Sequence, residues 1–283
     1  MRGRVLIVAG SDSGGGAGIQ ADIKTVTMLG AFAATAITAL TAQNTEGVHG
    51  VLPIAPSFIR QQMEVVLDDI GADAIKTGML HDAAVIETVA SVLAERAPTI
   101  PLVLDPVMVA KGGAPLIEPG AIDALKRRLV PRAAVLTPNL PEAEILCGGA
   151  IADVAAMREA AWALLDLGCG AVLLKGGHLD GDTVHDVLAT AAGFTEWTSP
   201  RIVTRHTHGT GCTLASAIAA GLAQGMAVVA AVERARDYVQ RAIATAPGLG
   251  RGHGPLDHAH PLRADLNPKP LGWCIELDYN LGN

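Results

Sequence analysis

The sequence predicts an α/β protein built in three layers, in which helices cover both faces of a mainly parallel central sheet. Short apolar runs of strand length alternate with longer segments of helical spacing along most of the 283 residues. Such alternation is typical of strands that lie side by side in a parallel sheet and are buried on both faces. Half of the residues are hydrophobic, which is enough for a sizeable core.

The predicted strands are the short apolar runs at Val5–Ala9, Ala33–Ala39, Ala74–Thr77, Leu102–Leu104, Ala134–Leu136 and Ala171–Leu174, with an edge hairpin at Val184–Ala189 and Phe194–Trp197. The predicted helices lie at Ile19–Leu29, Pro56–Asp68, Ala83–Arg96, Pro119–Leu129, Val154–Leu167, 212–223 and Val228–Ala244. No linker divides this pattern. We therefore expect a single domain over residues 1–265 and a tail of unknown role over 266–283.

Composition excludes several classes of partner. The net charge is −7, and the longest basic run is Lys126–Arg128, so we expect no nucleic-acid partner. No stretch is long and apolar enough to span a bilayer, and the first apolar run is too short for a signal peptide. The four cysteines contain no C-x-x-C pair, which is typical of free thiols in a reducing cytosol and predicts a cytoplasmic protein.

The first motif is the run from Gly10 to Gly18, which follows the first strand and holds five glycines. Glycines let a ligand approach the backbone closely. The run has neither the spacing of the dinucleotide-binding fingerprint nor the Gly-Lys-Ser/Thr of a phosphate-binding P-loop. The alternative is a flexible turn, although five glycines exceed what a turn requires.

Polar residues follow later strands. Gln43, within Thr41–Thr45, offers a donor and an acceptor in one plane, which suits an aminopyrimidine or pyridine ring, although a lone Gln is usually a solvated loop residue. Asp105 brings a carboxylate to the carboxyl edge of the sheet, where a ligand or Mg²⁺ could use it; a helix cap or turn is the alternative. Lys175, followed by two glycines, can reach a phosphate or can simply be solvated.

Asn139 and Glu142 are three residues apart at a helix start, so both can face one point. Oxygen ligands of this kind suit Mg²⁺ that also binds nucleotide phosphates. The alternative is a capping box, in which the two side chains cap the helix, and the spacing alone favours it.

The sharpest motif is His206–Cys212, which leads directly into a helix. Backbone N–H groups at a glycine-rich helix N-terminus form an anion hole, and the helix dipole favours negative charge there. We expect this position to lower the pKa of Cys212 and to let the thiolate take a proton from an attacking hydroxyl. The alternative is that Cys212 is an inert core residue. His206 and His208 form a His-x-His pattern, which is weak evidence for a metal site. Together these features indicate phosphoryl transfer.

These motifs resemble those of the hydroxymethylpyrimidine/phosphomethylpyrimidine kinases. The resemblance covers about residues 4–260 in order and without large gaps, and the tail beyond about Asp265 departs from it. The matching motifs are Ala9–Asp12, Gly16–Asp22, Ile37–Asn44, Lys76–Leu80, Asp105–Met108, Thr137–Ala143, Lys175–His178, Thr207–Cys212 and Gly252–Leu256.

The resemblance implies a ribokinase-like fold and an Mg²⁺- and ATP-dependent kinase of thiamine biosynthesis. Its acceptors would be 4-amino-5-hydroxymethyl-2-methylpyrimidine and the monophosphate of that alcohol. A homo-oligomer, with a dimer favoured, is a family expectation. A pyridoxal kinase that uses cysteine is the nearest alternative, and a non-catalytic binding module of the same fold is a remote one.

The resemblance also implies roles for individual residues, which we group by the ligand expected at each. The substrate group is Gln43, Ala17, Gly10, Asp12, Met79 and Val107. The ATP and phosphate group is Lys175, Asp105, Thr207 and Asn139, and the metal group is Glu142, Asn139 and Asp105 through Mg-ATP. The catalytic group is Cys212 as base, Gly209, Thr210 and Gly211 as anion hole, and Lys175.

Overall fold

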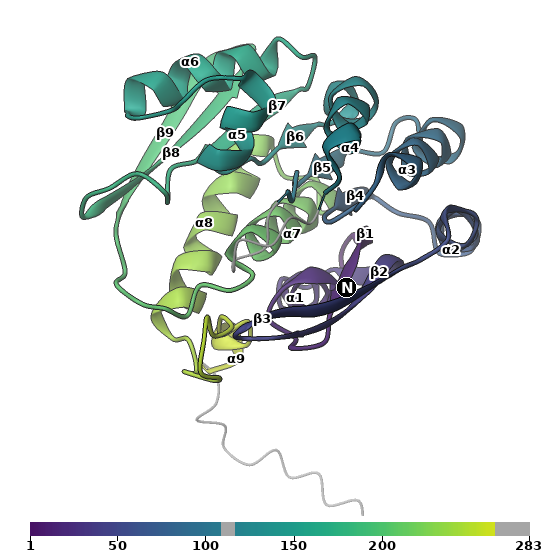
Figure 1. Ribbon diagram of the computed structural model, residues 1–283, viewed down its shortest axis with the longest axis horizontal. Coiled ribbons are helices and arrows are strands. Elements are labelled where there is room, and N and C mark those ends of the chain that lie inside the picture. The colour runs from purple at the N-terminus through teal and green to yellow at the C-terminus, as the bar shows by residue number, and fades with distance from the viewer. Residues whose placement is uncertain (109–116, 264–283) are drawn as a thin grey trace, which may run out of the picture.

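The predicted three-layer architecture is confirmed by the computed structural model, which describes residues 1–108 and 117–263. Figure 1 shows the central sheet with helices on both of its faces. The predicted tail, 266–283, lies outside the described residues. Within the described part of the chain, no helix is long and apolar enough to cross a membrane.

Nine strands of the described residues form one sheet, in the order β3-β2-β1-β4-β5-β6-β7-β8-β9. The six strands from β2 to β7 in this order are parallel, whereas β3, β8 and β9 pair antiparallel with their neighbours. The strands are β1 (Arg4–Asp12), β2 (Phe32–Asn44), β3 (Gly47–Pro53), β4 (Ala74–Thr77), β5 (Leu102–Leu104), β6 (Val135–Leu136), β7 (Ala171–Lys175), β8 (Thr183–Thr190) and β9 (Gly193–Pro200).

Successive residues of the parallel strands enter two separate cores, because side chains alternate between the faces of a strand. Val5 and Ile7 of β1 belong to the core beneath α1, α7 and α8. Leu6 and Val8 belong to the larger core on the other face, beneath α2 to α6. The helices are α1 (Gly18–Met28), α2 (Pro56–Asp69), α3 (Ala83–Arg96), α4 (Pro119–Ala124), α5 (Leu140–Cys147), α6 (Val154–Leu165), α7 (Thr210–Ala223), α8 (Val228–Ala244) and α9 (His260–Arg263).

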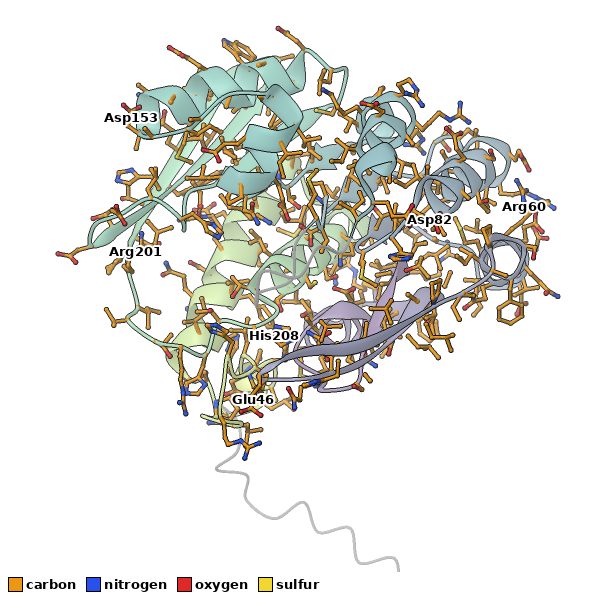
Figure 2. All side chains as sticks on the ribbon, in the orientation of Figure 1. Glu46, Arg60, Asp82, Asp153, Arg201 and His208 are labelled. Atoms are coloured by element: carbon orange, nitrogen blue, oxygen red, sulfur yellow. The ribbon has the colours of Figure 1, made fainter. Side chains whose placement is uncertain are left out.

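Helix starts follow from local capping. The side chains of Asp82 and Asp153, labelled in Figure 2, accept hydrogen bonds from the third residue of α3 and α6. Asn139 and Glu142 form the capping box that the spacing favoured, and α5 ends at Gly148 in the left-handed conformation. The sequence signals for these helix ends therefore act locally.

Several elements differ from the prediction. β1 continues to Asp12, so the first residues of the Gly10–Gly18 motif lie within the strand, and α9 was not predicted. β2 continues to Asn44, so Gln43 lies within the strand and not after it. β3 was not predicted, because most of its residues are exposed and give no apolar run. The predicted helix at Pro119–Leu129 is α4 followed by a π-helical turn, Leu125–Leu129, and a 3₁₀ turn, Val130–Arg132.

Helices α7 and α8 cross closely at Gly221, where a Cβ atom would lie 2.7 Å from Cβ of Ala231. We expect Gly221→Ala to lower the free energy of unfolding by roughly 1–3 kcal/mol through overpacking, even though alanine improves helix propensity by about 1 kcal/mol. Urea unfolding would measure this. Gly149→Ala is the matched control, because nothing lies within 4 Å of its Cβ position. Equal stability of both variants would contradict this packing.

Candidate active site

A cavity of about 720 Å³ opens at the carboxyl edge of the sheet, and every predicted site residue lines it. This is the edge at which ligands bind in open α/β sheets. The structure therefore brings together residues that are up to about two hundred positions apart in sequence. They are Gly10, Asp12, Ala17, Gln43, Met79, Asp105, Val107, Asn139, Glu142, Lys175, Thr207, Gly209, Thr210, Gly211 and Cys212.

The glycine-rich loop between β1 and α1 is organised by the carboxylate of Asp12. Its oxygens accept hydrogen bonds from the backbone N–H groups of Gly14 at 2.8 Å, Gly16 at 3.0 Å and Ala17 at 2.8 Å. His208 Nε2 donates to Asp12 Oδ2 at 2.8 Å. Asp12 thus shapes the glycine-rich loop and connects it to the loop before α7. Its contact with a substrate stays a prediction.

The two glycine loops touch through their backbones. A Cβ atom on Gly209 would lie 1.8 Å from the carbonyl oxygen of Gly16, and Gly209 has φ of 83°, in the left-handed region. A Cβ atom on Gly16 would lie 2.5 Å from the ring of His208. Any side chain at these positions would push the loops apart, so this contact requires glycine.

The first turn of α7 faces a cation and a carboxylate. Lys175 Nζ lies 3.3 Å from Asp105 Oδ1, and a Cβ atom on Gly211 would lie 3.4 Å from the same ammonium. Burial opposes the charged form of Lys175, but Asp105 and Glu142 outweigh it and raise the pKa of the lysine. The N-terminus of α7 and the Lys175 ammonium therefore make a positive surface for an anion such as phosphate.

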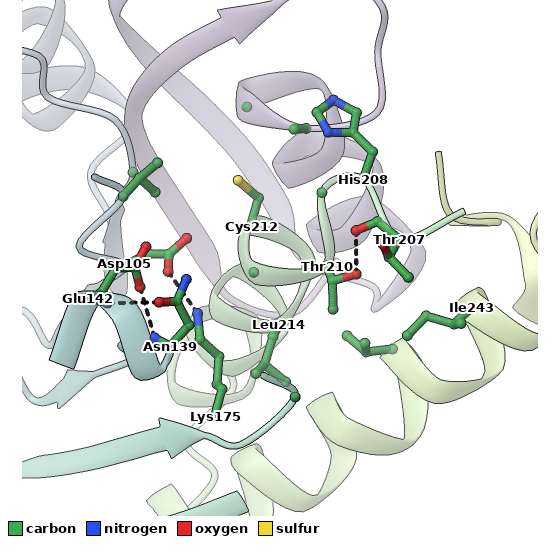
Figure 3. Close-up of a pocket in the computed structure, with 18 of the residues that line it drawn as sticks. Asp105, Asn139, Glu142, Lys175, Thr207, His208, Thr210, Cys212, Leu214 and Ile243 are labelled. Atoms are coloured by element: carbon green, nitrogen blue, oxygen red, sulfur yellow. Dashed lines mark hydrogen bonds and ion pairs between the residues drawn. The ribbon is translucent and has the colours of Figure 1, made fainter. Parts of the chain in front are cut away.

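Asn139 and Glu142 approach the same region from the start of α5, as Figure 3 shows beside Asp105 and Lys175. Asn139 Oδ1 accepts from the Glu142 N–H at 2.9 Å, and Glu142 Oε2 accepts from the Asn139 N–H at 2.8 Å. Burial raises the pKa of Glu142 to about 7; Lys175 opposes this shift and Asp105 adds to it. Two carboxylates thus share one nearby lysine.

The donor set fits a magnesium ion that is carried by nucleotide phosphates. Asp105 and Glu142 are hard oxygen donors, and carboxylate oxygens have lone pairs left after the capping interactions. A cation here would offset the repulsion from Asp105, which adds to burial in raising the pKa of Glu142. Among the described residues, no group of three or more His, Cys, Asp or Glu side chains could hold a metal by itself. Phosphate oxygens and waters would have to complete the coordination.

One end of the cavity lies between the glycine-rich loop and β2. Gln43 lines this end, and its Nε2 lies 3.4 Å from His208 Nε2. Met79 is buried against Gly10, because a Cβ atom on that glycine would lie 2.4 Å from the methionine Cε. A planar amide beside an apolar wall suits a small heteroaromatic ring.

Cys212 is half-buried on the first turn of α7, in Figure 3 between His208 and the Asp105–Lys175 pair. The expectation that the helix N-terminus lowers its pKa is wrong for the protein without ligands. Burial raises the pKa of the thiol to about 12; Lys76 and the N–H of Gly18 act in the opposite direction, and Asp22 and Asp105 add to burial. At neutral pH the thiol is therefore protonated.

The opposite end of the cavity is apolar, and Figure 3 places Leu214 and Ile243 there. Its floor is anchored by an ion pair in which Arg236 Nε donates to Asp186 Oδ2 at 2.8 Å. Asp186 also accepts from the N–H of Gly176, the residue after Lys175. The apolar residues that line this end include Val184, Ile202, Leu214, Val239 and Ile243.

Sequence reasoning missed the residues of the apolar end of the cavity and, among the charged and polar residues near the glycine loops, His208 and Lys76. His208 was treated only as part of a weak His-x-His pattern, although it joins the two glycine loops. Lys76, fully buried and lining the cavity, was quoted only within a motif. A lysine inside the apolar run of β4 was the available signal for it, because an unpaired lysine is almost never fully buried.

We expect Asp12→Asn to destabilise the protein at neutral pH, since an amide cannot replace the carboxylate as acceptor for three N–H groups. Although burial opposes it, the hydrogen bonds from His208 and Ala17 hold the pKa of Asp12 below its usual 3.8. Its stabilisation is therefore fully present above about pH 4 and is lost as the pH falls further. Urea unfolding should show a deficit of roughly 1–3 kcal/mol at pH 7 that shrinks near pH 3.

The control for this comparison is Asp166→Asn, which changes an exposed acid outside the cavity. A deficit for Asp12→Asn that stays constant from pH 7 to pH 3 would contradict the assigned carboxylate role.

Comparisons with known proteins identify the family of this chain. The family described as phosphomethylpyrimidine kinase matches residues 12–257. The bifunctional thiamine biosynthesis protein ThiED of Geobacter sulfurreducens is 55% identical over 258 residues. That match covers 91% of this chain and 52% of ThiED, so the chain spans about half the length of that relative.

The hydroxymethylpyrimidine/phosphomethylpyrimidine kinase of Haemophilus influenzae is 49% identical, and the match covers 90% of this chain and 96% of that kinase. The crystal structure of Bacillus subtilis pyridoxal kinase with ADP matches with a TM-score of 0.85 at 38% identity, covering 92% of this chain and 98% of that one. The ribokinase-like fold is thereby confirmed. By sequence and by fold, this chain belongs to the phosphomethylpyrimidine kinase family.

Proposed function

We propose that this chain transfers the γ-phosphoryl group of ATP to 4-amino-5-hydroxymethyl-2-methylpyrimidine and then to the resulting monophosphate, as a step of thiamine biosynthesis. The name of the H. influenzae relative supports the kinase activity, and the name of the G. sulfurreducens relative supports the role in thiamine biosynthesis. One observation carries the proposal: the start of α7, Lys175 and Asp105 converge in a cavity that has the planar amide of Gln43 at one end and apolar residues at the other.

The phosphates of ATP would bind where the free N–H groups of α7 and the Lys175 ammonium meet. The backbone N–H groups of Gly209, Thr210 and Gly211 would hold the oxygens of the migrating group. These donors are fixed and need no rearrangement during the reaction. Thr210 Oγ1 donates to the Thr207 carbonyl at 2.7 Å, which fixes the preceding loop. The apolar residues beyond Leu214 would take the adenine ring, and the ADP complex of the B. subtilis relative supports a nucleotide site in this fold.

The acceptor would lie at the other end, with Gln43 against the edge of the pyrimidine and Met79, Ala17 and Val107 around the ring. This arrangement points the hydroxymethyl group toward α7. Its oxygen would attack the γ-phosphorus in line with the departing ADP oxygen, and positioning of this kind supplies most of the catalysis in phosphoryl transfer.

Asp105 and Glu142, with Asn139 supporting Glu142 through the capping box, would hold Mg²⁺ on the phosphates. When bound, the ion would neutralise the charge of the transferring group. Cys212 lies between the acceptor end and the phosphate end, and we propose that it receives the proton of the acceptor hydroxyl. The cytoplasmic location and the homodimer expected from the sequence stay predictions.

Pyridoxal is the second candidate acceptor, because the B. subtilis relative of known structure is a pyridoxal kinase. We expect phosphorylation of hydroxymethylpyrimidine with Mg-ATP to exceed that of pyridoxal at least tenfold in kcat/KM, a discrimination of about 1.4 kcal/mol. Chromatography of the products would separate mono- and diphosphates. Phosphorylation of pyridoxal alone would overturn the proposed acceptor, and absence of transfer to either would overturn the kinase assignment.

Replacement of Cys212 tests its role. We expect Cys212→Ala to lower turnover by roughly 10²-fold, as for a lost general base, with ADP binding retained in calorimetry. Because burial raises the pKa of this thiol to about 12, the thiolate fraction grows about tenfold per pH unit across the neutral range, and the chemical step of the native enzyme should accelerate with pH. The control is Cys147→Ala, an exposed cysteine outside the cavity. Unchanged turnover would remove Cys212 from the mechanism.

A further inference from the structure

A fully buried ion pair lies beside the cavity and has no part in the mechanism above. Lys76 Nζ donates to both carboxylate oxygens of Asp22 at 2.9 Å, and neither side chain has any exposed surface. Ser216 Oγ donates to Asp22 Oδ1 at 2.7 Å. These three residues come from β4, α1 and α7, so the pair joins the sheet to both helices.

Stability alone gives no reason for this arrangement. Removing two charges from water costs several kcal/mol per ion, and well-packed apolar residues in place of a buried pair are often neutral or stabilising. A fully buried lysine that also lines a cavity is more readily explained by what its charge does there. Lys76 meets this description, because it lines the cavity that holds the proposed phosphate and acceptor positions.

Helix geometry places the pair one turn from Cys212. On α7, Cys212 and Ser216 are four residues apart and so lie on one face of the helix. On α1, which packs against α7, Gly18 and Asp22 have the same spacing. Ser216 donates a hydrogen bond to Asp22. One helical turn earlier on both helices, the N–H of Gly18 interacts with the Cys212 thiol.

Glycine at position 78 leaves room for the lysine. A Cβ atom on Gly78 would lie 3.1 Å from Lys76 Nζ, so a side chain there would crowd the ammonium. Asp22 holds the ammonium through both of its oxygens, and Ser216 in turn holds Asp22. The ammonium is therefore a fixed cation that cannot swing to the nucleotide as a surface lysine could.

Charged groups act on Cys212 from several elements. Asp22 of α1 and Asp105 after β5 oppose its ionisation, as burial does. Lys76 of β4 favours ionisation, and Lys175 of β7 also interacts with the thiol through its charge. Of the groups that lower the pKa of Cys212 against the effect of burial, Lys76 has the largest effect.

We propose that Lys76 is a positioning residue that stabilises the Cys212 thiolate, the form that receives the proton. Lys76 is held by Asp22, which is held in turn by Ser216. The inference rests on the proposed function, in which Cys212 receives the acceptor's proton. In that step the hydroxyl proton moves to Sγ, the acceptor oxygen bonds to the γ-phosphorus, and the bond from phosphorus to the ADP oxygen breaks. Lys76 supplies charge and exchanges no proton.

The test is the rate at which iodoacetamide alkylates Cys212 at pH 8, without nucleotide or acceptor. Mass spectrometry measures the alkylated fraction over time. Two variants change the charge in opposite ways. Lys76→Met combined with Asp22→Leu removes both charges and leaves no unpaired ion. Asp22→Asn keeps the cation and an acceptor for Ser216, and removes the opposing anion. Cys147, exposed in the same molecule, is the internal reference.

We expect the double variant to alkylate Cys212 more slowly and Asp22→Asn to alkylate it faster, each on the order of tenfold per unit of change in the pKa of the thiol. Cys147 should react at an unchanged rate. General loosening of the fold would accelerate Cys212 in both variants, so opposite directions would exclude a merely structural role. In the double variant, kcat should fall while KM for the acceptor stays constant.

An unchanged rate at Cys212 in the double variant, or changes of the same sign in both variants, would overturn the inference. If the double variant does not fold, Asp22→Asn alone decides, because slower or unchanged alkylation there would also overturn it. The alkylation needs no kinase activity. A native protein that transfers no phosphate would therefore refute the proposed function while the Lys76 result stood or fell by itself.

Discussion

Two loops from opposite ends of the chain share one backbone contact, and the geometry of the site depends on it. Gly209, at the start of α7, lies directly against the carbonyl oxygen of Gly16, where any Cβ atom would collide. Asp12 and His208 hold the two loops in this position by a short hydrogen bond. The contact sets the distance between the proposed anion hole and the proposed acceptor position, which is the distance that a transferred group would have to cross.

The parallel sheet supplies the rest of the arrangement. The strands β1, β4, β5 and β7 all carry a charged residue at or near the same edge, namely Asp12, Lys76, Asp105 and Lys175. Parallel strands present their carboxyl ends together, so residues distant in sequence meet without long loops. Helix α7 packs on one face of the sheet and begins at this edge, and Figure 3 shows its first turn near Asp105 and Lys175.

Charge balance within the cavity follows a common rule, in which each lysine is held by a carboxylate. Lys175 lies against Asp105, and Lys76 lies against Asp22. Cys212 sits within reach of both cations and in surroundings that oppose its ionisation. Exclusion of water strengthens every such interaction, which explains why fixed charges are placed so close to the half-buried thiol despite the cost of burying them.

The sequence by itself determined the layers, most strands and the positions of the site residues, because burial on both faces leaves apolar runs and glycine motifs mark close backbone contacts. It also predicted the capping box at Asn139, which is a local interaction. The tertiary structure alone decided that Gln43 lies inside β2, that Asp12 shapes its own loop, and that the pKa of Cys212 rises. Each of these depends on burial and on partners from distant segments of the chain, and a local sequence pattern encodes neither.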